Sequence, residues 1–596
     1  MQNEWIEERS RLQPEEMGKK TLRYICTTFG HRAFALEEFL REAPLDVPPA
    51  AWHIGLIQLC HSHIVRMMRK SWGERVYQVP VDAYFQQFPA CWPMIVERAD
   101  DQSSADDLII HCDTHRSMTE QVLAAIIAMD REPLLLTRQG KLHKKSLERM
   151  ESSLLWTPGL TEEVRSRLLM ETIDLVLRTG LACKTEGTIM LDETRVKGWL
   201  MLDAGLRDEQ MFLLWYRVHC PDQPGLHWLT GAVFCQADER WLPLAELMNA
   251  AWRHGVSLDE RAAEEWLLRM QTSGWLELGT DELGRRWVRR RERYRAGERT
   301  LVVQSDYEII ALPDTPFEVI RKLHQIGERL DWGAMQQYRL SRDSVQSAAR
   351  RGWQAAEIIG LLKGYALDEL PEHLGRSIHQ WVEELSGIRV YQGTVLEVSD
   401  RRAAALLEWQ RPELPIRPLN ERYWLAEGLS AEEVMKLLAS KGMAATMNLG
   451  PETQSECCVS ALESSTENFT LSMEEALMPR APGLFSPRDS SVLYREEQPS
   501  SLLDEVYPDY RKIPASWYEQ YRRYHHSTAK QLIEQAMRWR TGVRLRIAGE
   551  DHVVVPHQLE ERDGVWTMEG SSGSMRIAIK VGEIELLKLL MPGLME

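Results

Sequence analysis

Residues 273–295 read SGWLELGTDELGRRWVRRRERYR, and this stretch decides the local fold. An apolar strand that begins at Trp275 leads into a turn between Gly279 and Gly284. A return strand begins at Arg286. Two short apolar runs that are joined by a glycine-containing turn are typical of a β-hairpin. We therefore expect a hairpin whose second strand is rich in arginine.

The residues before the hairpin predict a helix. Ser257 can cap this helix, and Glu260, three residues on, completes a capping box. Apolar side chains recur at helical spacing from Ala263 to Met270, and Gly274 suits the left-handed position after a helix. Helix, glycine, strand, turn and strand in this order predict the back half of a winged helix.

The same order occurs a second time upstream. Thr161 can cap a helix that ends at Gly180. Strands are expected at residues 181–183 and 188–191, with a turn at Gly187 between them.

A third, looser copy lies nearer the start of the chain. It has a helix over about residues 49–62, a strand at 64–67 and a second strand at 75–79, with a turn near Gly73. Three similar units predict a tandem array of winged-helix-like modules. We place these modules at residues 20–100, 105–205 and 206–299.

Positive charge is concentrated in the hairpin of the third module. Eight arginines lie within residues 285–299: Arg285, Arg286, Arg289, Arg290, Arg291, Arg293, Arg295 and Arg299. The planar guanidinium suits phosphate oxygens, so contact with DNA phosphates is one interpretation. The other is a solvated basic face that pairs with acidic groups of this chain or of a partner.

A smaller basic cluster precedes the helix of the second module. It reads RQGKLHKK over residues 138–145, and its DNA-binding candidates are Lys141, Lys144 and Lys145. The DNA-binding candidates of the third module are Arg285, Arg286, Arg289, Arg290, Arg291 and Arg293. The outward residues of the helix before that hairpin include Asp259, Glu260, Glu264 and Glu265. Because these carboxylates would repel DNA, they favour backbone binding without sequence reading, or no DNA binding.

Composition limits the class of protein. The chain has 596 residues, 44% of them hydrophobic and 27% charged, which predicts a globular protein of several domains. Its net charge of −17 argues against general coating of nucleic acid but allows a local basic patch. No apolar run approaches the roughly 20 residues that cross a bilayer, and the N-terminus has no secretory signal. We expect a cytoplasmic protein with no membrane contact.

Cysteine and histidine patterns indicate neither disulfides nor a metal centre. The nine cysteines are odd in number, scattered and without a CxxC pair, and the adjacent Cys457 and Cys458 lie in linker-like sequence. Two clusters carry metal-ligand types, at residues 60–63 and 111–115, but neither has a second half at zinc-finger spacing. We expect no metal and no other cofactor.

The middle of the chain combines strand-like and helix-like stretches. A broken strand is expected at 301–310, helices at 315–330, 335–365 and 371–385, and Ser341 can cap one of them. The stretches LVVQSDYEIIAL, YRLSRDSVQSAARRGWQAAEIIGLL and LPEHLGRSIHQWVEEL resemble the helicase-associated domain at the N-terminus of bacterial XPB-type helicases. They also resemble stand-alone bacterial helicase-associated proteins, and this resemblance extends more weakly over residues 20–447.

The resemblance implies a DNA-transaction setting and supplies no catalytic residues. The chain has no G-x-x-x-x-G-K-[ST] loop for phosphates and no DEAD- or DEAH-type acidic box for magnesium. Phosphoryl transfer by a helicase motor needs both. No G-x-S-x-G elbow or H-E-x-x-H motif occurs either. We therefore expect a protein that is not an enzyme.

The tail divides into a linker and a final domain. Residues 448–510 are rich in Ser, Glu and Pro, with one short helix expected at LSMEEALM. Residues 511–596 carry a helix near 530–537 and then the short strands VRLRIA, HVVVPHQLE, GVWTMEG and MRIAIKV. This order resembles the WYL domain, an Sm-like β-barrel of bacterial regulators, on Pro556, Leu559 and Trp566. The triplet Trp566-Thr567-Met568 departs from the Trp-Tyr-Leu motif, which puts ligand binding in doubt.

Together these features predict an α+β multi-domain protein. Tandem winged-helix-like modules lead into a helicase-associated α/β domain at 300–447, a linker, and a small Sm-like β-rich domain. The leading functional interpretation is a non-catalytic protein that binds duplex or single-stranded DNA in repair, recombination or transcription regulation. One alternative is a scaffold that docks a separate helicase or nuclease. Another is a WYL-type regulator that senses a ligand.

Overall fold

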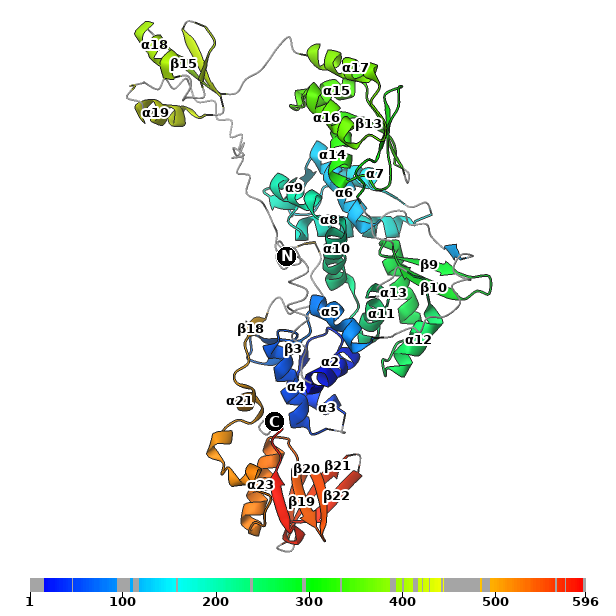
Figure 1. Ribbon diagram of the computed structural model, residues 1–596, viewed down its shortest axis with the longest axis vertical. Helices are drawn as coiled ribbons and strands as arrows, with labels where there is room; N and C mark the ends of the chain where they lie inside the picture. The colour runs from blue at the N-terminus through cyan, green and yellow to red at the C-terminus, as the bar shows by residue number, and fades with distance from the viewer. Residues whose placement is uncertain are drawn as a thin grey trace. The chain divides into compact units, whose positions relative to one another are not determined.

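The structure is a computed structural model of the chain, and it divides into two units (Figure 1). The first unit consists of Met1–Ala296 and Ser472–Glu596, and the second of Gly297–Leu471. The residues that the structure describes are 16–44, 47–93, 108–110, 117–156, 159–235, 240–291, 296–332, 335–385, 393–398, 401–410, 416–420, 422–427, 429–440, 443, 483–484, 494–562, 565–573 and 575–592.

In the first unit, one order of elements occurs three times: helix, short strand, helix, helix, strand, strand. The first copy contains α2 (Glu16–Thr28), β1 (Phe34–Ala35), α3 (Leu36–Glu42), α4 (Pro49–His61), β2 (Arg66–Arg69) and β3 (Arg75–Gln78), followed by α5 (Val81–Cys91). Its strands pair antiparallel in the order β1-β3-β2. Helix α4, PAAWHIGLIQLCH, is apolar on nearly all sides and is buried from Ala50 to Ile57. A helix that is apolar all round belongs in a core rather than on a surface.

The second copy repeats this order and this strand pairing. It contains α6 (Met118–Arg131), β5 (Leu134–Leu135), α7 (Lys144–Ser153), α8 (Glu162–Arg178), β6 (Ala182–Thr185) and β7 (Thr188–Leu191), and α9 (Glu193–Met201) and α10 (Ala204–His219) follow. The sheet order is β5-β7-β6. The Thr161 hydroxyl accepts a hydrogen bond from the amide of Val164 at 3.4 Å, which confirms the expected cap of α8.

The third copy adds one strand to the same plan. It contains α11 (Pro224–Phe234), β8 (Leu242–Pro243), α12 (Leu244–Arg253), α13 (Glu260–Thr272), β9 (Leu276–Thr280) and β10 (Arg286–Arg290), with β4 (Ile109–Ile110) at the sheet edge. The sheet order is β4-β9-β10-β8. The expected cap of α13 at Ser257 was wrong, because the Asp259 carboxylate accepts from the amide of Ala262 at 2.8 Å. An ionised carboxylate is a strong acceptor for the free amides of a helix start.

The second unit begins with a four-stranded antiparallel sheet and four helices. These are β11 (Leu301–Val303), β12 (Glu308–Ala311), α14 (Phe317–Ile326), β13 (Glu328–Trp332), β14 (Gln336–Arg339), α15 (Arg342–Arg350), α16 (Ala355–Tyr365) and α17 (Glu372–Glu383). The sheet order is β11-β12-β14-β13. The Ser341 hydroxyl caps α15 by accepting from the amide of Ser344, as expected.

The hairpin of β13 and β14 corrects the expectation of helices at 315–330 and 335–365. Helix α14 ends at Ile326, and residues 328–332 pair as a strand with residues 336–339. Strand β14 also pairs with β12, so this segment gains hydrogen bonds from residues about 30 positions earlier. The pairing with β12 favours strand over helix for this segment. It cannot be inferred from the local sequence, because the partner strand lies far away along the chain.

The second unit ends with a small three-stranded sheet and two helices. These are β15 (Gly393–Glu397), α18 (Arg401–Gln410), β16 (Ile416–Pro418), β17 (Tyr423–Glu427) and α19 (Ala431–Ser440), with sheet order β15-β17-β16. Leu407, Trp424 and Leu438 lie in their common hydrophobic core.

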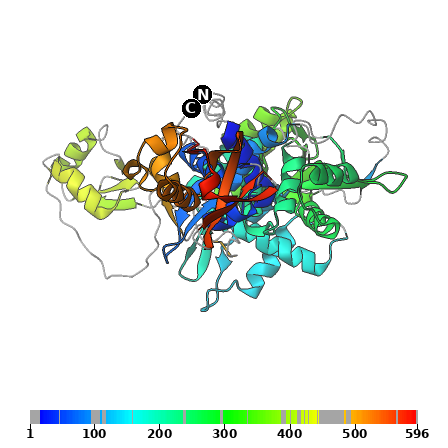
Figure 2. The same ribbon diagram turned by 90° about the horizontal axis from the view of Figure 1, so that it is seen from below.

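The C-terminal part returns to the first unit and ends in a five-stranded sheet. Its elements are β18 (Arg495–Glu497), α21 (Leu502–Val506), η3 (Tyr510–Lys512), α22 (Ser516–Glu519), α23 (His526–Arg538), β19 (Val543–Ile547), β20 (Glu550–Arg562), β21 (Val565–Ser572), β22 (Met575–Lys580), η4 (Val581–Glu583) and β23 (Leu586–Leu589). The sheet order is β22-β21-β20-β19-β23, and α23 lies beside the sheet (Figure 2). The long strand β20 shifts register between Pro556 and Gln558.

Two expectations about the tail need revision. The region 448–510 is not linker throughout, because β18 and α21 form inside it and β18 pairs with β2. The sequence also missed β23, whose partner β19 lies more than 40 residues earlier. The helix expected at LSMEEALM lies outside the described residues.

Candidate functional site

The turn of the arginine hairpin is held by one buried carboxylate. Asp281 accepts hydrogen bonds from the amides of Leu283 at 3.0 Å and Arg285 at 2.8 Å. The same carboxylate accepts from the Arg285 guanidinium at 2.6 Å and from the Trp287 indole at 3.2 Å. Gly284 sits at φ +76°, a conformation that the turn requires and that glycine adopts without strain.

The described arginines of the hairpin already have partners within the first unit. Arg286 forms an ion pair with Glu264 of α13, and Arg289 with Glu277 of β9 at 2.5 Å. Arg291 reaches Glu120 of α6 at 3.4 Å, and Arg290 donates to the carbonyl of Phe234 at 3.3 Å. Arg293 lies outside the described residues. The structure thus shows pairing with acidic groups of this chain, one of the two interpretations of this charge, and contact with DNA phosphates stays a prediction.

Helix α13 offers DNA little positive charge. The Arg286 guanidinium hydrogen-bonds to Glu264 and holds the pKa of that carboxyl below its ordinary value, so the pair stays charged at neutral pH. Arg261 and Glu265 form a second pair, at 3.0 Å, on the exposed face. Leu268 on the same helix is 56% exposed. The face combines neutralised charge with apolar surface, which does not suit phosphate.

The basic cluster of the second module differs from the arginine hairpin because its lysines are exposed to solvent. Lys141, Lys144 and Lys145 are all exposed, as is Arg138. They lie on the connection from β5 to α7 and on the first turn of that helix. Lys144 forms one loose pair with Glu148 at 3.7 Å, and both side chains are more than half exposed. Such a pair contributes little and leaves the lysine accessible.

Backbone hydrogen bonds fix the shape of this connection. The amide of Thr137 donates to the carbonyl of Lys141 at 2.7 Å, and Gly140 adopts φ +74° in the turn. The Ser146 hydroxyl accepts from the amide of Leu135 at 3.0 Å and ties α7 to β5. The lysines therefore project from an ordered turn.

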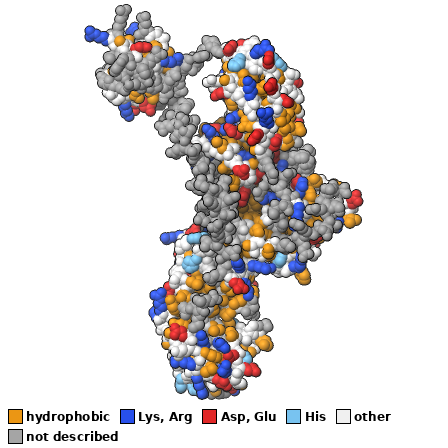
Figure 3. Space-filling view, in the orientation of Figure 1, with side chains coloured by type: hydrophobic (Ala, Val, Ile, Leu, Met, Phe, Trp, Pro, Cys, Tyr) orange, Lys and Arg blue, Asp and Glu red, His pale blue; other side chains and the backbone are white. Residues whose placement is uncertain are grey.

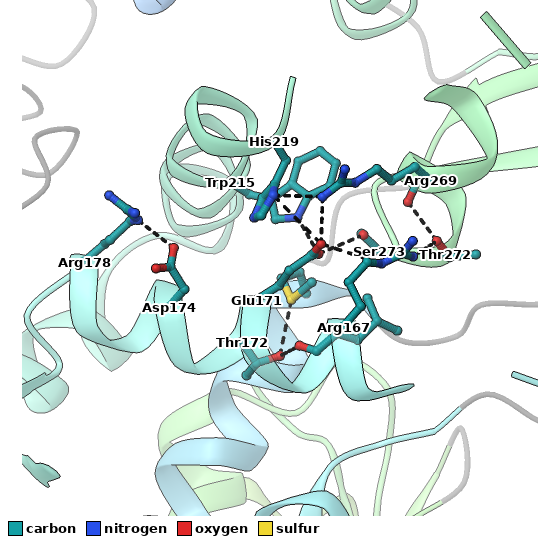
Figure 4. A network of polar contacts seen from close by, with 12 residues as sticks. Arg167, Glu171, Thr172, Asp174, Arg178, Trp215, His219, Arg269, Thr272 and Ser273 are labelled. Atoms are coloured by element: carbon teal, nitrogen blue, oxygen red, sulfur yellow. Dashed lines mark hydrogen bonds and ion pairs between the residues drawn. The ribbon is translucent and has the colours of Figure 1, made fainter. Parts of the chain in front are cut away.

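A buried polar network connects the second and third modules, and sequence reasoning missed it (Figure 4). The Glu171 carboxylate on α8 accepts from the Trp215 indole at 2.8 Å and from the Ser273 hydroxyl at 3.3 Å. Arg269 of α13 donates to it at 3.0 Å and approaches His219 at 2.8 Å. One sequence feature could have indicated the network: Glu171 lies between Leu168 and Leu175 on the apolar face of α8. The network fixes the inner face of α13.

A second buried ion pair on α8 receives the returning chain. Arg178 and Asp174 pair at 2.6 Å with almost no exposure. Asp174 also accepts a hydrogen bond from the amide of Leu484 at 2.5 Å. A Cβ at Gly483 would lie 2.1 Å from that carboxylate, so only glycine fits there.

One group of metal-ligand types lies together in the described part of the chain. Ligand atoms of His31, Cys220 and His227 are within 4.8 Å of one another. However, the two imidazoles stack at 3.6 Å with an interplanar angle of 20°, so their lone pairs do not converge. His227 accepts from the amide of His31 at 3.3 Å and contacts the carbonyl of Pro221 at 2.9 Å. Stacking and hydrogen bonding account for these rings, which do not form a metal cage.

Of the two metal-ligand clusters noted in the sequence, the structure describes only residues 60–63. Cys60 is buried on α4, where burial raises the pKa of its thiol, while His61 is exposed. Residues 111–115 lie outside the described residues.

The C-terminal sheet carries its own polar cluster. Asp551 accepts from Arg544 and Arg546, each at 2.7 Å, and from the Tyr521 hydroxyl at 2.8 Å. The Arg546 and Arg544 guanidinium groups hold the pKa of Asp551 well below its usual range. Trp566 lies under the Lys530 ammonium, which is 3.6 Å from the ring centroid.

Charge is mixed on the described surface in the view of Figure 3, where Lys and Arg side chains are interspersed with Asp and Glu. None of the helices in the described part of the chain has both the length and the apolar character needed to cross a membrane.

Comparison with known protein families finds one match. The family model of the helicase conserved C-terminal domain matches residues 301–412, less than a fifth of the chain. That region is therefore similar to this domain, and the match does not show the XPB-type relationship. No curated protein matches the chain.

Among the solved structures that match is the proteasome accessory factor B/C (PafBC) of Arthrobacter aurescens. It is 10% identical and covers 80% of this chain and 85% of its own. The TM-score is 0.11, too low to carry an argument about fold or function.

Proposed function

We propose that this chain is a non-catalytic, cytoplasmic DNA-binding protein of the helicase-associated type. The observation that carries the proposal is the exposed cluster of Lys141, Lys144 and Lys145 on an ordered turn of the second module. Lysine ammonium groups bind phosphate as point charges and read no bases. The protein therefore holds the DNA backbone without sequence preference, in repair, recombination or transcription regulation.

The threefold order of elements supports the same proposal. Helix, short strand, helix, helix, strand, strand, with the first strand paired to the last, is the plan expected of winged-helix modules. The third helices of these modules do not favour base reading, because α4 is buried and α13 carries paired acids. Contact between a loop and the DNA backbone is compatible with the structure of all three modules.

The test is a salt titration of the full chain against fluorescent duplex and single-stranded DNA. We expect binding at low salt that weakens steeply as salt rises, because phosphate contacts release counterions. Replacing Lys141, Lys144 and Lys145 by alanine should weaken binding to all sequences. It should also flatten the log–log salt slope by up to about 2.7 on duplex DNA, at about 0.9 per contact.

Two matched variants make this test specific. Alanine at Lys197, Lys363 and Lys580 removes the same charge from three other exposed lysines and should leave affinity unchanged. Alanine at Arg285, Arg286, Arg289 and Arg290 should affect affinity less than the lysine triple, because these side chains are paired internally. Equal loss from the control triple, or no binding at low salt, would refute the proposal.

A protein-docking role is the second candidate, and the third module favours it. Trp252 on α12 is 81% exposed and Leu283 at the hairpin tip is 77% exposed, in addition to Leu268 on α13. Large exposed apolar side chains mark protein interfaces more often than DNA interfaces. If a separate helicase or nuclease docks here, Trp252→Ala and Leu268→Ala should abolish its capture without changing DNA affinity.

The C-terminal sheet supports a regulator of the WYL type as a further reading. Its strand order β22-β21-β20-β19-β23 brings the fifth strand back to the first, and β20 shifts register between Pro556 and Gln558, as at a bulge, which bends a strand. This is the arrangement expected of an Sm-like barrel. Trp566, under Lys530, and Thr567 are half-buried, whereas Met568 is fully buried, so the triplet offers at most two side chains to a ligand.

A further inference from the structure

The wing of the first module is strongly basic. Its two strands and turn, Arg66–Gln78, contain four cations and a single carboxylate. The cations are Arg66, Arg69, Lys70 and Arg75, and the carboxylate is Glu74, which pairs with Lys70 at 3.1 Å. The hairpin by itself leaves three positive charges unbalanced.

The balancing carboxylates come from the far end of the chain. Arg69 donates to both oxygens of Glu497, at 2.5 and 3.0 Å, in a bidentate pair. Arg75 reaches the same carboxylate at 3.3 Å and Glu505 at 3.0 Å. In the third module, by contrast, Arg285 and Arg289 pair with acids of the hairpin itself, and Arg286 pairs with an acid of α13. Bidentate carboxylate pairing uses the same guanidinium face that binds phosphate.

A short segment carries these acids, and we call residues 495–506 the strap. Its strand β18 adds three residues to the free edge of β2, and α21 lies on α4. Beyond its end, Tyr507 is fully buried, and its hydroxyl donates to the carbonyl of Pro592 at 3.1 Å. The strap is therefore anchored after α21 and held at β18 by few backbone bonds.

The β18 end can open without unfolding the module. Three strand residues supply few hydrogen bonds, and water reaches part of the Arg69 and Arg75 side chains, which screens their ion pairs. Segments with little buried apolar contact open locally at low free-energy cost. Opening of β18 would free Arg69 and remove one of the two carboxylates from Arg75, while Tyr507 keeps the strap attached.

We propose that the wing of the first module is a second binding surface for nucleic-acid phosphate, which the acidic strap covers in cis. The strap's carboxylates occupy the positions that phosphate oxygens would take on Arg69 and Arg75. This inference rests on the proposed DNA-binding function and adds a second surface that is switched by strap opening. Nucleic acid and strap then compete for the same guanidinium groups.

The test compares two double variants of the full chain. Glu497→Gln with Glu505→Gln removes the covering charges. Glu496→Gln with Asp504→Asn is the control, which removes two other charges from the strap. Both side chains are exposed, and Asp504 accepts a hydrogen bond from the Ser501 hydroxyl rather than from a wing arginine. Hydrogen exchange of the Arg66–Gln78 amides reports opening, and the DNA salt titration reports binding.

We expect the first variant to exchange faster at β2 and to bind duplex DNA roughly three- to tenfold tighter, because it loses the three ion pairs that cover Arg69 and Arg75. The control should change affinity less than twofold. Adding Arg69→Ala and Arg75→Ala should remove the gain. If the double variant misfolds, Glu497→Gln alone tests whether loss of the Arg69–Glu497 ion pair increases DNA affinity.

Faster exchange without tighter binding would overturn the proposal, as would unchanged exchange. The lysine triple separates this result from the main proposal. If Lys141, Lys144 and Lys145 prove irrelevant but the strap variant still gains affinity, the wing site stands alone. If the lysines matter and the strap variant gains nothing, the wing inference fails and the lysine site stands.

Discussion

The Trp215 indole on α10 donates a 2.8 Å hydrogen bond to the Glu171 carboxylate on α8, and both side chains are buried. Arg269 of α13 completes the charge balance at 3.0 Å. A single carboxylate thus joins three helices from two modules. Removing one member of such a group leaves the others buried without a partner.

Glu171→Gln should destabilise this junction by about 2–4 kcal/mol, because the Arg269 charge loses its counterion in a mostly dry site. Urea unfolding followed by tryptophan fluorescence should show a lower midpoint, and the amides of α8 and α13 should exchange faster. Glu163→Gln, on the exposed start of α8, is the control and should change neither. An unchanged midpoint for Glu171→Gln would show that the network adds no stability.

The stacked histidines predict loss of stability in acid. Burial lowers the pKa of His31 from 6.5 to about 3, and burial next to His31 also lowers the pKa of His227. The unfolded chain therefore binds more protons than the folded chain between about pH 3 and 6.5. Stability from these groups is complete above pH 6.5 and falls as the pH drops through that window, by at most about 1.4 kcal/mol per pH unit for each histidine.

His31→Gln should make this pH dependence shallower, because glutamine does not titrate there. The measurement is the urea midpoint at several pH values between 4 and 8. His61→Gln, at an exposed site, should leave the slope as it is. Equal slopes for wild type and His31→Gln would contradict the assignment of acid sensitivity to the stack.

Asp281 should control the order of the arginine hairpin. Asp281→Asn weakens bonds to two amides, a guanidinium and an indole, so the turn should open more often. Hydrogen exchange across Leu276–Arg290 should rise by about tenfold. Glu282→Gln is the neighbouring control, with an exposed side chain. The same rise in both variants would mean that net charge, rather than these bonds, holds the turn.

Two glycines predict opposite effects of alanine. A Cβ at Gly225 of α11 would lie 2.2 Å from the carbonyl oxygen of Ser257, so Gly225→Ala should destabilise the third module by about 1–3 kcal/mol. Gly198 of α9 has no neighbour within 4 Å of such a Cβ, so Gly198→Ala should stabilise by about 0.4–1 kcal/mol. Thermal unfolding of both variants checks the signs. Stabilisation by Gly225→Ala would show that α11 can shift.

Much of the local structure was predictable from sequence alone. The caps at Thr161 and Ser341, strand β7 at 188–191 and helix α17 follow from short-range patterns that the structure confirms. The hairpin at 273–295 was expected because turn glycines and apolar runs lie within 20 residues. These features depend on neighbours in the chain, which sequence reasoning can see.

Features that depend on distant neighbours were not predictable. Strand β14 pairs with β12, β23 with β19 and β18 with β2, and none of these partners is local. Glu171 was passed over because Trp215, Arg269 and Ser273, which contact its carboxylate, come from other parts of the sequence. The pairing of Arg69 and Arg75 in the wing of the first module was not predictable either, because the carboxylates that they contact lie more than 400 positions away in the sequence.

The sequence by itself determined the repeated modules, the position of the arginine-rich hairpin and the helicase-associated stretch. Each rests on periodicity, capping and turn chemistry, which act over a few residues. Only the tertiary structure decided which charges are available. Arg286 and Arg289 are neutralised by carboxylates that folding brings within reach, whereas Lys141 and Lys145 stay in solvent. Electrostatic pairing depends on distance in space, so a run of like charge in sequence does not reveal the charge that a partner meets.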